Sequence, residues 1–85
     1  MQHERSPEET ERLRQLANSL DCLTEDEHLL LSGWTAETAK SKRKRGEGPP
    51  YVLHGRNYFY PRKPYCEYLR QRVHQRAEPP IAELL

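Results

Sequence analysis

The sequence predicts one small, mainly α-helical domain that carries a single β-hairpin. Four stretches, at about 7–20, 24–31, 35–45 and 64–76, combine helix start signals with helix-forming residues. A fifth stretch, 51–60, has two runs of aromatic and β-branched residues on either side of a turn that contains glycine and asparagine. The chain has 85 residues, of which 34% are hydrophobic and 32% are charged, so it can hold one domain with a small core.

The first helix is predicted from its start signal and its apolar stripe. Ser6 can cap the helix, Pro7 suits its first position, and Glu9 completes a capping box. The apolar residues that recur at helical spacing are Leu13, Leu16, Ala17 and Leu20. We expect this stripe to pack on its own domain, and the alternative is a helix that docks on a partner or a second copy.

The next two helices are predicted to form a helix-turn-helix. Thr24 and Glu27 form a second capping box, and Ser32-Gly33 end the helix that follows. Thr35 then caps a third helix, which runs into the cations of residues 40–45 and is stopped by Gly46, Gly48 and two prolines. Trp34 is placed to fill the corner between the two helices.

The hairpin and the last helix complete the predicted domain. Tyr51-Val52-Leu53 and Tyr58-Phe59-Tyr60 are the two strands, and 54–57 form the turn. Pro61 ends the second strand and Pro64 opens the last helix, after which 77–85 read as a tail. The residues expected in the core are Leu29, Leu30, Trp34, Val52, Phe59, Tyr65, Tyr68 and Leu69.

Charge is strongly separated along the chain, although the net charge is only +1. Residues 1–37 hold 3 basic and 9 acidic side chains, whereas residues 38–76 hold 11 basic and 2 acidic ones. A basic surface of this kind attracts polyanions. Nucleic acid is the expected partner, and an acidic protein or an anionic membrane is the alternative.

Other classes of function find little support in the sequence. Cys22 and Cys66 lack the spacing of a zinc site or a disulfide framework and are expected to be reduced, partly buried thiols. The four histidines are scattered, and no nucleophile has a recognisable base beside it, so we expect a non-enzyme without a metal or cofactor. No apolar run is long enough for a signal peptide or a membrane span, which favours a cytoplasmic protein.

Residues 33–61, GWTAETAKSKRKRGEGPPYVLHGRNYFYP, resemble the helix-turn-helix and wing of the excisionase/AlpA-like family, small winged relatives of the MerR regulators. The resemblance covers roughly residues 22–70 and implies a winged helix-turn-helix, which we place at 22–76. The N-terminal helix then occupies 1–21 and the tail 77–85. It also implies a role in a phage or other mobile element, either as an excisionase that bends DNA for a recombinase or as a small transcriptional regulator. Such a protein would lie in the nucleoid of a bacterial host.

One departure from that family concerns how the third helix is held. Lys42 stands where such families often have an aromatic residue, and Ala39 where a leucine commonly packs. We therefore expect Trp34, Ala36 and Ala39 to support this helix.

The predicted interface with duplex DNA comprises the third helix and the tip of the hairpin. The residues expected near base edges or flanking phosphates are Thr35, Glu37, Thr38, Ser41, Lys42 and Arg45. Lys40, Arg43 and Lys44 are expected on the phosphate backbone, and His54, Arg56 and Asn57 along the minor groove. The alternatives are an adaptor that binds proteins through 7–20 and the tail, and an RNA-binding protein, for which the sequence has no specific motif.

A single helix and wing cover too few base pairs for specific recognition in a genome, so several copies are expected to bind together. A dimer through 7–20 requires an inverted repeat. Head-to-tail neighbours require direct repeats, and the opposite charges of 1–37 and 38–76 favour this second arrangement.

Overall fold

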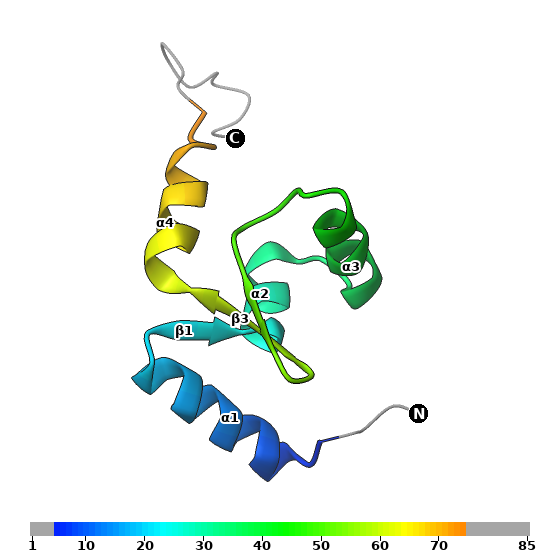
Figure 1. Ribbon diagram of the computed structural model, residues 1–85, viewed down its shortest axis with the longest axis vertical. Coiled ribbons are helices and arrows are strands. Elements are labelled where there is room, and N and C mark those ends of the chain that lie inside the picture. Colours follow the sequence, from blue (N-terminus) through cyan, green and yellow to red (C-terminus); the bar gives the residue numbers. More distant parts are fainter. Residues whose placement is uncertain (1–4, 75–85) are drawn as a thin grey trace, which may run out of the picture.

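The computed structural model describes residues 5–74, which form four helices and a small antiparallel sheet (Figure 1). In chain order the elements are α1 (Pro7–Ser19), β1 (Cys22–Thr24), α2 (Glu25–Ser32), α3 (Ala36–Lys44), β2 (Val52–His54), β3 (Asn57–Pro61) and α4 (Arg62–Arg70). The mainly helical class with a hairpin is confirmed. Residues 1–4 and the predicted tail at 77–85 lie outside the described residues.

The sheet has three strands in the order β1-β3-β2, one more than the sequence predicted. The hairpin pairs Val52 with Phe59 and His54 with Asn57, and β1 pairs antiparallel with the other edge of β3. Leu23 lies opposite Tyr60 in that second pairing. The hairpin is therefore attached to the segment that leads into α2.

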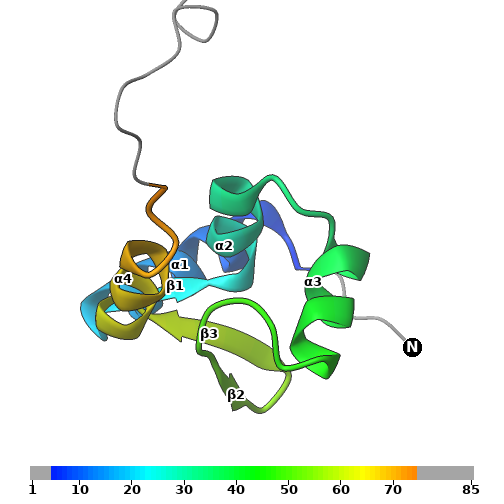
Figure 2. The same ribbon diagram turned by 90° about the horizontal axis from the view of Figure 1, so that it is seen from above.

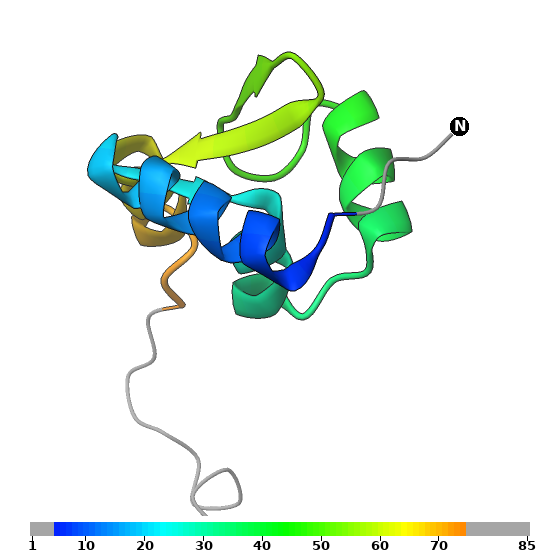
Figure 3. The same ribbon diagram turned by 90° about the horizontal axis from the view of Figure 1, so that it is seen from below.

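The helices surround this sheet on several sides. α1 runs along the sheet beside β1, and α2 packs behind β1 and β3 (Figure 3). α3 and α4 lie on opposite sides of α2 (Figure 2). This arrangement places α3 next to the hairpin.

Most helix ends agree with their sequence signals, but α4 differs. The capping boxes of Ser6 with Glu9 and of Thr24 with Glu27 are both formed, which confirms those predictions. α4 begins at Arg62 rather than Pro64, because the backbone of Pro61 already serves as its N-cap without a side-chain hydrogen bond. It ends at Arg70, whereas the predicted helix continued to 76.

The core is smaller and more polar than the expected list of large apolar residues. Leu30, Val52 and Leu69 are exposed, and of that list only Tyr65 is fully buried. In the apolar stripe of α1, Ala17 is buried and Leu13 half-buried, whereas Leu16 and Leu20 are exposed. The residues that are buried instead include Thr24, His28, Ala39, Pro49 and Tyr60.

His28 lies at the centre of this core and joins rings from three other segments. Its ring stacks on Tyr60 with 4.3 Å between centroids, and a hydrogen bond of 2.8 Å joins its Nδ1 atom to the Tyr65 hydroxyl. Trp34 meets the same ring edge-on at 5.4 Å. Burial lowers the pKa of His28, so the neutral ring is favoured inside the fold. A chain poor in aliphatic residues thus uses rings and hydrogen bonds to hold its elements together.

Candidate nucleic-acid interface

α3 begins sharply after α2 because the connection uses two well-matched caps. Gly33 ends α2 in the left-handed conformation at φ 73°, which suits a residue without a side chain. The Thr35 hydroxyl then accepts a hydrogen bond of 3.1 Å from the Thr38 backbone N–H. These caps fix where α3 starts and therefore which of its residues face the protein.

The inward face of α3 consists of Ala39 and Arg43, which are one turn apart. Ala39 is buried, and the side chain of Arg43 is only 12% exposed. Ala36 is exposed, so the expectation that it supports the helix is wrong. Ala39 is buried as expected, and Arg43, which was not expected there, supports the helix with it. Trp34 remains half-buried at the corner, as a supporting residue would be.

Arg43 is the centre of an internal polar cluster with Glu25 of α2 and Tyr60 of β3. Its Nη1 atom lies 3.1 Å from Glu25 Oε2 and 3.0 Å from the Tyr60 hydroxyl. The Tyr60 hydroxyl donates a hydrogen bond of 2.6 Å to Glu25 Oε1. We call Glu25, Arg43 and Tyr60 the anchor cluster. Burial and then the nearby carboxylate raise the pKa of Tyr60, so its hydroxyl stays protonated and available as a donor.

The anchor cluster also joins α3 to the hairpin. The Arg43 guanidinium lies 3.7 Å from the centroid of the Tyr58 ring, a stacking distance. Burial lowers the pKa of Arg43, but the hydrogen bond and charge of Glu25 outweigh this effect, and the pKa is raised overall. The phosphate contact expected of Arg43 disagrees with this geometry, because the Arg43 guanidinium is already paired with Glu25 and Tyr60 inside the protein.

The outward face of α3 carries most of the other residues that the sequence assigned to DNA. Those that are exposed are Thr35, Glu37, Thr38, Lys40, Ser41, Lys44 and Arg45. Glu37 lies in the first helical turn, where the helix dipole favours a carboxylate, and the cations lie in the last turns, where it favours positive charge. Hydroxyl groups and cations are therefore presented together on one exposed surface.

The loop after α3 partly neutralises two of these cations. Glu47 lies 3.7 Å from the Lys42 ammonium and 3.3 Å from the Arg45 guanidinium, and the hydrogen bond from Arg45 lowers the pKa of Glu47. Lys42 is half-buried, and its ammonium lies 5.1 Å from the Trp34 ring centroid. Lys40 and Lys44 are consequently the more available positive charges on α3.

The hairpin tip brings its predicted residues together and adds one that the sequence did not predict. His54 and Arg56 are exposed, and Gly55 between them has a φ of 63° that suits the turn. The half-buried Asn57 accepts a hydrogen bond through Oδ1 from the guanidinium of Arg5. Arg5 and Arg56 line the same hollow between α1 and the hairpin. No local signal pointed to Arg5, because it precedes the cap of α1 and is brought to the tip only by the tertiary fold.

Potential metal ligands, cysteines and the lengths of the helices bear on other kinds of site in the part of the chain that the structure describes. Residues 5–74 contain no cluster of three or more potential metal ligands among histidine, cysteine, aspartate and glutamate. Cys22 is half-buried and Cys66 is exposed, so only the first fits the expected burial. Among the described helices, none combines the length and apolar character needed to cross a membrane.

Comparison with known proteins adds no further assignment. No family model matches the chain, and neither does any curated protein or solved structure. The arrangement of α2, α3 and the hairpin is therefore the basis for any functional argument.

Proposed function

We propose that this protein binds duplex DNA as a winged helix-turn-helix, with α3 as the recognition helix and the β2–β3 hairpin as the wing. The observation that carries the proposal is the division of α3 into two faces. Ala39 and Arg43 hold the helix against the domain, and the opposite surface presents hydroxyls and cations to solvent. A basic helix that lies beside a basic hairpin tip can reach one duplex at two places.

The dimensions of α3 suit the major groove. An α-helix with its side chains is about 10–12 Å across, which fits a major groove about 12 Å wide. The nine residues of α3 would extend roughly 13 Å along that groove. Thr38 and Ser41 are one turn apart on the exposed surface and carry hydroxyls that can read base edges. Lys40 and Lys44 would meet phosphates on the walls of the groove.

The wing would lie along the neighbouring minor groove. Arg56 at its tip is exposed, and arginine is favoured there by the stronger negative potential. Arg5 adds a second guanidinium at the same tip through its hydrogen bond to Asn57. Arg43 packs on the ring of Tyr58, so α3 contacts the strand that begins at this tip.

Within this proposal, the resemblance to excisionase/AlpA-like proteins favours a role in a mobile element. Bending DNA for a recombinase and regulating transcription are both compatible with the same interface. Several copies would bind together, and α1 offers the exposed Leu16 and Leu20 for contact with a neighbour. Sedimentation of the free protein and of its DNA complex would separate a stable dimer from neighbours that assemble only on DNA.

The proposal is tested by titrating duplex DNA at several salt concentrations. If about four to six phosphates are neutralised, the slope of log affinity against log salt should be near −4 to −5. The Lys44→Ala variant should weaken binding to all duplexes and reduce the slope by about 1. Arg70→Ala is the matched control, because it removes the same charge from an exposed site at the end of α4, away from α3.

Sequence preference provides a second, independent readout. Selection of binding sites from random duplexes should give a changed consensus for Thr38→Ala or Ser41→Ala, since base contacts specify the sequence. Lys44→Ala should keep the consensus. Absence of binding at low salt, or equal effects of Lys44→Ala and Arg70→Ala, would refute the proposed interface.

A further inference from the structure

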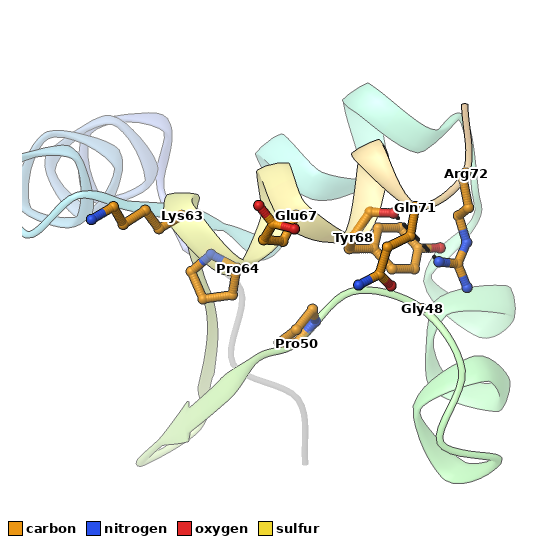
Figure 4. Close-up of a pocket in the computed structure, with 8 residues that line it drawn as sticks. All are labelled: Gly48, Pro50, Lys63, Pro64, Glu67, Tyr68, Gln71 and Arg72. Carbon is orange, nitrogen blue, oxygen red and sulfur yellow. Dashed lines mark hydrogen bonds between the residues drawn. The ribbon is translucent and has the colours of Figure 1, made fainter. Parts of the chain in front are cut away.

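α4 borders an open groove that the proposed DNA interface does not use (Figure 4). Its cavity of about 650 Å³ lies between α4 and the loop that follows α3, with Pro50, Pro64 and Tyr68 on its walls. Lys63 and Arg72 stand at its two ends in Figure 4. The groove therefore combines apolar ring surfaces with positive charge.

A second hollow of about 260 Å³ adjoins this groove and shares Tyr68 and Arg72 with it. It is mainly apolar and is lined by Leu31, Trp34, Tyr65 and Leu69. Leu31 is 65% exposed and Leu69 is 51% exposed, so both leucines leave apolar surface open to solvent at this hollow. We call this second cavity the Trp34 hollow. It has the chemistry to accept two or three aliphatic side chains.

The chain leaves α4 beside this hollow. Arg72, which lines it, lies only two residues before His74, the last described residue. Residues 77–85, AEPPIAELL, then supply the aliphatic side chains Ile81, Leu84 and Leu85. Ile81 is seven residues beyond His74, a reach of roughly 23–25 Å for extended chain. Leu69 is five residues before His74, which is at most about 18 Å, so the segment can fold back to the hollow.

Opposite charges also favour contact between residues 77–85 and the groove beside the Trp34 hollow. The segment carries Glu78 and Glu83, and the groove is lined by Lys63 and Arg72 together with Glu67, which leaves a net positive charge. Of these charged residues, Arg72 also lines the Trp34 hollow. The Arg72 guanidinium already lies over the Tyr68 ring, 3.8 Å from its centroid, which places a cation between the two cavities. An acidic segment with aliphatic residues therefore matches the groove in both polarity and charge.

We propose that residues 81–85 dock into the Trp34 hollow of their own chain, with Ile81, Leu84 and Leu85 as the anchoring side chains. A short tether gives the segment a local concentration in the millimolar range, so a weak contact is enough to keep it bound. Docking would cover Leu31 and Leu69 and brace α2 against α4. This inference does not depend on DNA binding.

Trp34 is the single tryptophan of the chain and lines the hollow, so its indole N–H is a direct probe. The experiment compares the NMR spectra of the full chain and of the full-length double variant Leu84→Ser, Leu85→Ser. The Trp34 indole and the Leu69 amide should shift in the double variant, and its thermal midpoint should fall by roughly 4–8 °C. Ala82→Ser is the matched control within the same segment and should leave both readouts unchanged.

Adding a peptide of residues 77–85 to the double variant should restore the wild-type shifts in a saturable manner. Wild-type shifts that are independent of protein concentration support docking within one chain. Unchanged Trp34 and Leu69 signals in the double variant would overturn the proposal. Shifts that appear only at high protein concentration would also overturn it, because the hollow would then bind the segment of a second copy.

Discussion

Replacing Arg43 by alanine should destabilise the fold far more than replacing its neighbour Lys44. Both are cations near the end of α3, but only Arg43 belongs to the anchor cluster. Its loss leaves the Glu25 carboxylate without its cation and removes the ring contact with Tyr58. The two substitutions thus separate a charge that holds the protein together from a charge that is offered to solvent.

The size of the effect follows from the partial burial of the pair. Removing one partner of a fully buried ion pair costs about 3–5 kcal/mol. The Glu25 side chain is 24% exposed, so water can partly replace the guanidinium, and we expect about 2–3 kcal/mol. In a domain of this size that loss lowers the thermal midpoint by roughly 10–20 °C. Lys44→Ala should change the free energy of unfolding by less than about 0.5 kcal/mol.

Urea and thermal unfolding of the two variants, followed by circular dichroism, measure this difference directly. A double-mutant cycle of Arg43→Ala with Glu25→Gln should give a coupling energy of about 1 kcal/mol or more. Equal midpoints for Arg43→Ala and Lys44→Ala, or a coupling energy near zero, would show that the anchor cluster does not hold α3.

Three further predictions concern the residues around the core. Burial lowers the pKa of His28 below its ordinary 6.5, so the free energy of unfolding should be highest above that pH and should decrease as the pH drops below it. His28→Gln should lack this pH dependence when unfolding is measured between pH 7.5 and 5. Trp34→Ala should cost about 3 kcal/mol, because the indole fills the corner between α2 and α3, and an unchanged midpoint would argue against that role. Gly48→Ala should cost about 1 kcal/mol in denaturant unfolding through its φ of 90° alone, because a Cβ there would meet Trp34 at an ordinary 3.7 Å.

Local signals in the sequence predicted the helices well. Ser6, Thr24 and Thr35 each accept the capping hydrogen bond that their position suggests, because a cap involves only residues three apart. The sequence did not predict β1, because a strand of three residues shows no readable periodicity. Its pairing is also distant in the chain, since Leu23 lies opposite Tyr60, 37 positions away. The start of α4 was misplaced because Pro64 can occupy the third helical position as well as the first.

The core and the support of α3 were harder to predict because they depend on polar partners from distant segments. Leu30 has the composition of a core residue but is 85% exposed, while His28, two positions earlier, is buried. Nothing near Arg43 in the sequence distinguishes it from Lys42 or Lys44. Only the meeting of α2, α3 and β3 brings Glu25 and Tyr60 within hydrogen-bonding distance of it.

The two faces of α3 have a consequence for engineering. Because the inward contacts of α3 come from Ala39, Arg43 and the half-buried Lys42, the exposed positions 37, 38, 40, 41 and 44 can be randomised with little effect on the packing beneath them. A library built at these positions should retain the fold in most of its members. Substitutions on the exposed face of α3 can then change what the helix binds, while the residues on its inward face are kept.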